Sequence, residues 1–198
     1  MKYNFTSGAE LIEKCKEFNM TIGQLCLERE AELSGLSKEE VREKMAVSLD
    51  IMKKATERAV TEDIKSVGGL IGGEAKKLEN HRNTQKTVCG GLMNKALAAA
   101  MGTMEVNASM GLIVAAPTAG SCGILPGAIV TIGKEYGFSD DEMLDALFTA
   151  SAIGAIITRN ATVAGAEGGC QAETGASTFS SCNSCISSYY SSYSWCCK

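Results

Sequence analysis

The sequence predicts a mainly α-helical protein in which glycine-rich loops join the helices. Three observations support this prediction: helix-capping patterns recur, apolar residues follow them at helical spacing, and small residues dominate the second half. With 198 residues, of which 45% are hydrophobic, the chain can bury a core without disulfide or metal staples. We therefore expect a folded globular protein rather than a disordered chain.

Residues 1–87 form a charged, amphipathic helical part. They hold 15 basic and 15 acidic residues, whereas the rest of the chain holds 4 and 8. Thr21 can cap the N-terminus of a helix, and Gly35 stands where that helix would end. Ser37 and Glu40 make a capping box for the next helix, and its apolar stripe predicts a core face. That stripe comprises Val41, Met45, Leu49 and Met52.

The segment SVGGLIGG, residues 66–73, contains four glycines. Its backbone N–H groups could approach an anionic ligand such as a carboxylate. It lacks the Lys-Ser/Thr ending of a phosphate-binding loop, and no predicted strand precedes it, as a dinucleotide-binding fingerprint requires. We therefore favour a plain turn over an anion site.

Residues 88–176 form a second helical part, rich in Ala, Gly, Val and Ile. Small residues at helical positions are typical of helices that pack closely inside a larger assembly. Pro126 suits the first turn of a helix, and Ser139 with Glu142 makes a second capping box. We expect most of this part to be buried.

The tail, residues 177–198, differs in composition from the rest. It contains nine serines and four cysteines, has no acidic residue and shows no apolar periodicity. Because the change occurs within a few residues, we interpret the tail as a shifted reading frame or an unrelated ending, and we expect it to be disordered. Its Cys182-Asn-Ser-Cys185 and Cys196-Cys197 pairs are similar to zinc or redox motifs, but they lack neighbours that would fix four thiols.

The charge balance excludes some classes of partner. The formal net charge of −4 gives no basic surface for a nucleic acid or an acidic membrane, so the expected ligands are small molecules or proteins. No apolar run approaches the roughly 20 residues of a membrane-spanning helix, and the first residues do not resemble a signal peptide. We expect a soluble, cytoplasmic protein whose nine cysteines are reduced unless they hold a metal or a cluster.

Two glycine-rich loops each present one thiol. APTAGSCGILPG, residues 116–127, contains Cys122, and NATVAGAEGGCQAETG, residues 160–175, contains Cys170. Thiolates are soft ligands that select zinc, copper or iron-sulfur clusters, and these two can meet only through folding. A free cysteine is also often a small buried hydrophobic residue, so both interpretations stay open at this point. The single histidine, His81, lies in a polar stretch and is expected at the surface.

The two loop sequences, followed in order as APTAGSCGILPG and GAEGGCQAE, resemble the signature of the iron-sulfur L-serine dehydratases. EVNASMG, residues 105–111, fits the same family, and the resemblance extends to about Ala176. The resemblance implies a helical domain like the α chain of a serine dehydratase, a place in amino-acid catabolism and gluconeogenesis, and a separate β subunit as partner. It also implies that this chain is an incomplete α subunit, since the tail departs from the family.

In that family a 4Fe-4S cluster is held by three cysteines, and one iron stays open for substrate. Cys122 and Cys170 match two of the ligand positions. The third is expected shortly after GGCQAE, where this sequence departs from the family, so Cys182 would be an accidental replacement.

The implied reaction removes water from L-serine and yields pyruvate and ammonia, with iron acting on the β-hydroxyl and a base on the α-proton. Thr118, Ser121 and Asn160 flank the two cysteines and are the candidate substrate-binding residues, although each could instead cap a helix or close a turn. No base is named, and the acidic neighbours Glu167 and Glu173 could orient a ligand. Pyridoxal phosphate is not expected, because Lys95 and Lys134 lie in helix-like surroundings.

Two alternatives to a serine dehydratase remain from the sequence. A related cluster-dependent lyase, such as a cysteine desulfidase, would share the cysteine motifs, because those motifs report the cofactor better than the substrate. A non-catalytic fragment that pairs with the β subunit would be favoured by loss of the segment after Ala176.

Overall fold

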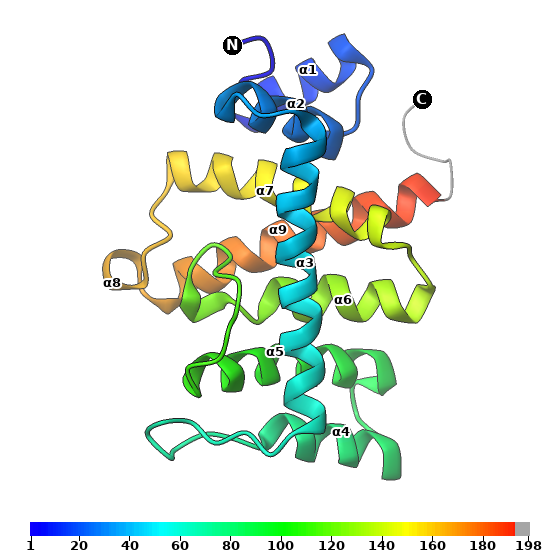
Figure 1. Ribbon diagram of the computed structural model, residues 1–198, viewed down its shortest axis with the longest axis vertical. Helices are drawn as coiled ribbons and strands as arrows, with labels where there is room; N and C mark the ends of the chain where they lie inside the picture. The colour runs from blue at the N-terminus through cyan, green and yellow to red at the C-terminus, as the bar shows by residue number, and fades with distance from the viewer. Residues whose placement is uncertain (193–198) are drawn as a thin grey trace. The chain divides into compact units, whose positions relative to one another are not determined.

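The computed structural model describes residues 1–192, with side chains as far as Cys185. Within these residues the chain forms nine α-helices and one short 3₁₀ helix, and it contains no β-strand (Figure 1). The prediction of a mainly α-helical protein is therefore confirmed. No helix in this part of the chain has the length and apolar character needed to cross a membrane.

The described chain divides into two compact units that are interleaved in the sequence. The first unit combines residues 1–47 with the chain from Ser139 onward, and the second unit is residues 48–138. The boundary between them falls inside helix α3, Lys38–Thr61. We call these the first unit and the second unit.

This division differs from the expected succession of residues 1–87 and 88–176. The change in charge at Thr87 falls within the second unit, between two helices that pack against each other. A change of composition along the chain therefore marks no boundary between compact units here.

The first unit is built around helix α7, which packs against α2 and α9 (Figure 1). Its core contains three large apolar side chains from the N-terminal segment, Phe5, Leu11 and Leu25, together with Phe148 of α7. The two ends of the described chain thus share one core. The helices of this unit are α1 (Gly8–Phe18), α2 (Ile22–Ser34), α7 (Asp140–Asn160), α8 (Gly165–Gly168) and α9 (Cys170–Ser192).

The second unit is a stack of helices in which α5 lies between α4 and α6 (Figure 1). Its core is formed largely by small side chains, including Ala59, Ala75 and Val106. The elements of this unit after α3 are α4 (Glu74–Thr84), α5 (Gly90–Ala108), the 3₁₀ helix η1 (Ala119–Ser121) and α6 (Ile124–Tyr136).

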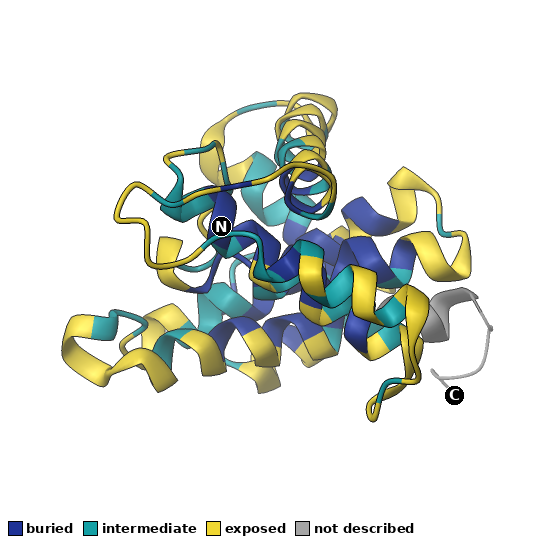
Figure 2. Ribbon diagram, turned by 90° about the horizontal axis from the view of Figure 1, so that it is seen from below, coloured by how far each residue is buried: buried dark blue, intermediate teal, exposed yellow. Residues whose placement is uncertain are grey.

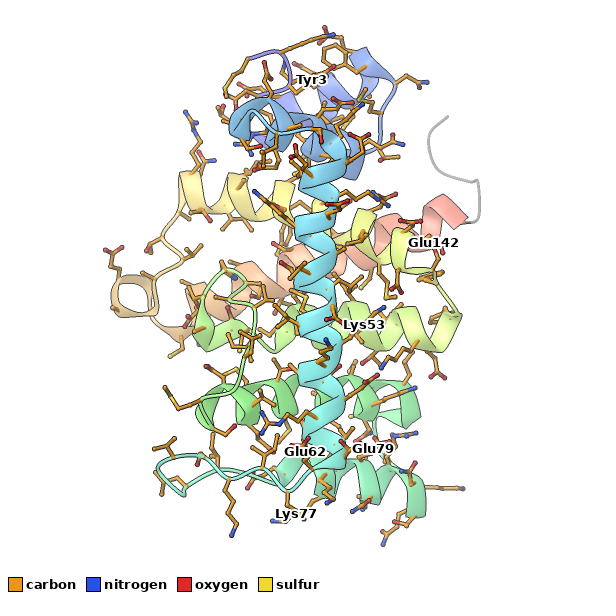
Figure 3. All side chains as sticks on the ribbon, in the orientation of Figure 1. Tyr3, Lys53, Glu62, Lys77, Glu79 and Glu142 are labelled. Carbon is orange, nitrogen blue, oxygen red and sulfur yellow. The ribbon has the colours of Figure 1, made fainter. Side chains whose placement is uncertain are left out.

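The capping patterns predicted from the sequence begin the helices as expected. Thr21 accepts the N–H of Gln24 at the start of α2, and Gly35 ends that helix with φ 69°. Ser139 forms the predicted capping box with Glu142, which lies at the N-terminal end of α7 (Figure 3). These local hydrogen bonds satisfy N–H groups that have no partner inside the helix.

The apolar stripe of α3 also lies where it was predicted. Leu49 and Met52 are buried, while Val41 and Met45 are partly buried against the core of the first unit. Figure 2 shows the same division along most of the helices, with buried residues on one side and exposed residues on the other.

Small residues let α5 and α6 approach closely, as the composition of this segment predicted. A Cβ atom placed on Gly123 would lie 2.2 Å from the carbonyl oxygen of Ala100, and one on Gly127 would lie 2.8 Å from the Ala100 Cβ. Real Cβ contacts are longer than this, so both positions require glycine for this packing. The close contact fixes the start of α6 on the surface of α5.

The tail differs from the disordered segment that was expected, because helix α9 continues from Cys170 to Ser192. Four serines on it are buried and recur at intervals of three, one and three residues, which is helical spacing. The hydroxyls of Ser181 and Ser184 donate to carbonyls four residues earlier, so they leave no unpaired polar group. The four are Ser177, Ser180, Ser181 and Ser184. Cys196 and Cys197 lie outside the described residues.

Candidate active site

The first cysteine loop, residues 116–123, leads into the N-terminus of α6. The turn is closed by the Ser121 hydroxyl, which lies 3.3 Å from the Thr118 hydroxyl and donates to the Ala116 carbonyl over 3.4 Å. Ser121 is 1% exposed, whereas Thr118 is partly exposed. The structure thus brings both of these predicted substrate-binding residues together, with Ser121 turned towards its own loop.

Cys122 is fully buried at the end of this loop, immediately before the helix. Its Sγ lies 3.5 Å from the Sδ of Met104, on α5. Burial raises the pKa of the Cys122 thiol to about 11, partly offset by its own backbone N–H, so the thiol is protonated near neutral pH. A soft metal or cluster at this sulfur would have to displace that proton.

Helix α5 holds the loop through a second contact. The side-chain amide of Asn107 donates to the carbonyl of Ala119 over 3.1 Å. The backbone N–H of Cys122 donates to the same carbonyl over 3.5 Å. Met104 and Asn107 stand three residues apart, on one face of α5, so this face contacts both the thiol and the turn.

The second cysteine loop places Cys170 at the first position of α9, where the side chain is exposed. The two preceding glycines shape this turn. A Cβ on Gly168 would lie 2.7 Å from the Cβ of Ala172, and Gly169 has φ 76°, a conformation that favours glycine. Each motif therefore delivers its cysteine to the beginning of a helix, where backbone N–H groups favour a negatively charged sulfur.

Asn160 ends α7 at the start of this second motif. Its side-chain amide donates to the carbonyls of Thr6, at 3.0 Å, and Ile156, at 2.8 Å. It therefore ties the end of α7 to the N-terminal segment. Of the acidic neighbours, Glu167 accepts the Thr162 hydroxyl over 2.8 Å.

The described residues supply thiols of the right chemistry for an iron-sulfur cluster but do not complete a three-thiol site. No three or more His, Cys, Asp or Glu side chains among them form a group that could hold a metal ion. Cys182 lies on the same helix as Cys170, twelve residues later, which is about 18 Å along the axis. The two cannot bind one small cluster while α9 is continuous.

The glycine segment 66–73 forms a turn, and its N–H groups bind carboxylates of the chain itself. Gly72 donates to Glu74, at 2.7 Å, and Gly73 donates to Glu105, at 2.9 Å. Glu105 is 3% exposed and also accepts the N–H of Ala75 over 2.8 Å. Sequence reasoning foresaw a carboxylate here only as a ligand, and it missed Glu105 because the partner lies 30 residues away.

The histidine occupies the surface position that was predicted. His81 is exposed on α4, in the last turn of the helix. It has no place in either cysteine loop.

Comparison with known proteins places these motifs in a family. Residues 17–187 match the family described as Serine dehydratase alpha chain. The chain belongs to the serine dehydratase alpha chain family. The match continues beyond Ala176, where the resemblance of the sequence was expected to stop, and includes most of α9.

Individual relatives of this serine dehydratase alpha chain carry the same name. The chain is 41% identical over 172 residues to the L-serine dehydratase, alpha chain, of Peptoniphilus asaccharolyticus, covering 87% of this chain and 59% of that protein. It is 37% identical over 174 residues to the probable L-serine dehydratase, alpha chain, of Bacillus subtilis, covering 88% and 58%. L-serine dehydratase 2 of Escherichia coli is 31% identical over 178 residues, covering 87% of this chain and 39% of that protein.

The chain spans about three fifths of the length of the curated alpha chains it matches. Both cysteine loops, Asn107 and Glu105 lie within the matched residues 17–187. The serine dehydratase alpha chain fold described here is therefore the part of the family that contains these motifs.

Proposed function

We propose that this protein acts in the dehydration of L-serine to pyruvate and ammonia, as an alpha chain that uses a 4Fe-4S cluster. The observation that supports the proposal best is the shared geometry of the two motif loops. Each ends in a cysteine at the beginning of a long helix, with glycines beside it that allow close packing or a positive φ.

In this proposal Cys122 and Cys170 are two of the thiolate ligands. They come from different units, so a cluster would join elements that are far apart in the sequence. The third ligand is not supplied by Cys182, for the geometric reason given above. It would come from another part of the complete enzyme. When bound, the open iron would supply Lewis-acid stabilisation of the leaving hydroxyl group.

The substrate-binding roles follow from which polar groups are free to turn outward. Thr118 is partly exposed at the edge of the first loop, and its hydroxyl can accept or donate towards a serine carboxylate. Ser121 would shape the loop from inside. Asn160, whose N–H groups are used by two carbonyls, would present its oxygen to the substrate amine.

We also propose a β subunit as partner. The relatives are named alpha chains, which denotes one chain of a multi-chain enzyme. The chain's own length against those relatives makes additional protein surface a requirement of the proposed activity.

The test is anaerobic reconstitution of the purified chain with iron and sulfide, with and without a β subunit. Visible absorption reports the cluster, and pyruvate formed from L-serine reports the reaction. Cys122→Ser and Cys170→Ser should each abolish cluster absorption. Cys89→Ser is the matched control, because Cys89 is an exposed thiol outside both motifs and its loss should leave the cluster unchanged.

Each outcome decides something. Loss of the cluster in both motif variants but not in the control supports the ligand assignment. An equal cluster in all four proteins would contradict it. If a cluster forms and L-cysteine rather than L-serine is consumed, with sulfide released, the chain belongs to a related lyase activity instead.

A further inference from the structure

Asn107 has no role in the family motifs as read from the sequence, yet it makes the hydrogen bond that joins the cysteine loop to α5. Its amide donates to Ala119 over 3.1 Å, which is ordinary hydrogen-bond length. The bonds within the loop are longer, at 3.3–3.5 Å. The contact from α5 is therefore the best-formed polar contact of the η1 turn.

The acceptor of this bond lies next to the thiol in the hydrogen-bond pattern. The Ala119 carbonyl accepts both the Asn107 amide and the backbone N–H of Cys122. One turn earlier on α5, Met104 meets the Cys122 sulfur at 3.5 Å. Orientation of the Ala119 carbonyl thus determines whether Cys122 stays against Met104.

The far side of the thiol is fixed by backbone packing. Gly123 follows Cys122 directly, and its Cα is so close to Ala100 that no Cβ fits there. The sulfur cannot become accessible by movement of α6 alone without breaking this contact. The turn at residues 119–121 is the part that can move.

We propose that Asn107 is a positioning residue for Cys122: its side-chain amide holds the cysteine loop closed, with the thiol buried against Met104. Breaking the hydrogen bond to Ala119 opens the turn and exposes the sulfur. Asn107 thereby controls access of electrophiles and soft metals to this thiol. The importance of that control rests on the proposed ligand role of Cys122, but the contact itself does not.

The test measures how fast iodoacetamide alkylates each cysteine of the intact chain, with no iron added. Trypsin cuts after Lys and Arg, so Cys26, Cys89 and Cys122 fall on three different peptides that mass spectrometry can quantify separately. In the natural chain Cys122 should react much more slowly than exposed Cys89. Cys26, buried in the first unit, reports global unfolding.

Asn107→Asp keeps the shape of the side chain and removes the N–H donor. Loss of one neutral hydrogen bond should raise the alkylation rate of Cys122 roughly three- to tenfold, since the rate follows the open population, and Cys26 should be unaffected. Asn107→Gln keeps the amide and should restore part of the protection. Asn94→Ala is the matched control, because Asn94 makes the same kind of bond on α5, to Gly90, away from the loop.

Three results would overturn the proposal. Cys122 could react as fast as Cys89 in the natural chain, Asn107→Asp could leave it protected, or Cys26 and Cys122 could rise together. The last result would reduce Asn107 to a general stabilising residue. Because no cluster or activity is measured, failure here is distinguishable from failure of the proposed dehydratase function.

Discussion

The carboxylate of Glu105 on α5 accepts the backbone N–H of Ala75, at 2.8 Å, at the start of α4. It is an N-terminal cap supplied by a different helix, because the cap position of α4 is occupied by Gly73, which has no side chain to offer. The negative charge also faces the positive end of the α4 dipole. One buried side chain therefore both starts α4 and attaches it to α5.

We predict that Glu105→Ala lowers the free energy of unfolding by roughly 2–3 kcal/mol, because two charge-assisted hydrogen bonds are lost and buried N–H groups are left unpaired. Urea unfolding followed by circular dichroism measures the change. Glu62→Ala is the control: Glu62 lies exposed just after α3 (Figure 3) and pairs with Arg58, so its loss should change stability by less than about 1 kcal/mol. Equal effects of the two substitutions would contradict the capping role of Glu105.

The glycines of the second unit should respond in opposite directions to alanine. Gly123→Ala places a methyl group against the Ala100 backbone and should lower the free energy of unfolding by roughly 1–3 kcal/mol. Gly91→Ala, also in a helix, meets no atom within 4 Å and should raise it by up to about 1 kcal/mol. A thermal shift of the same sign for both variants would show that the α5–α6 contact is looser than described.

Cys26 should make stability depend on alkaline pH. Burial, with a smaller contribution from Glu30, raises the pKa of its thiol from 9.0 to about 12. The unfolded chain releases this proton at lower pH than the folded chain, so the stabilisation is complete below pH 9 and is lost as pH rises towards 12.

The measurement is urea unfolding of the natural chain and of Cys26→Ala from pH 7 upward. The difference in unfolding free energy should shrink above about pH 9, and effects of lysine and tyrosine cancel in that difference. A difference that stays constant with pH would show that Cys26 titrates in the folded chain as it does in the unfolded chain.

The buried serines of α9 should tolerate only small replacements. Ser184→Ala should stay within about 0.5 kcal/mol of the natural chain, because alanine favours the helix and replaces a bond to the helix's own carbonyl. Ser184→Leu should lower the unfolding free energy by roughly 1–3 kcal/mol, because a fully buried position cannot accept the larger side chain.

Thr178 provides the matched control on the same helix. It makes the same bond to a carbonyl four residues earlier, but its side chain is exposed. Thr178→Leu should therefore leave stability nearly unchanged. If both leucine variants are tolerated, the serine face is not packed as described.

The parts of the fold that could be predicted from sequence depend on short-range patterns. Thr21 and Ser139 start helices through groups three residues away, and a sequence shows such pairs directly. Both cysteines could be named because they stand in glycine loops that also resemble a family. The ligand role of each stays a prediction.

What could not be predicted depends on partners distant in the chain. Glu105 and Asn107 both lie in EVNASMG, but only the fold brings them to Ala75 and to Ala119. The serines of α9 were overlooked for a different reason: the search for periodicity counted apolar residues, whereas a close helix contact accepts any small side chain whose hydroxyl bonds to its own helix.

The interleaving of the two units has a consequence for synthesis on the ribosome. The second unit is continuous, so all of its chain has emerged once Phe138 leaves the exit tunnel. Phe5 and Leu25 must wait for Phe148, which is made more than a hundred residues later, before their shared core can form. Until then their apolar side chains are open to water, and to any chaperone that binds nascent chains.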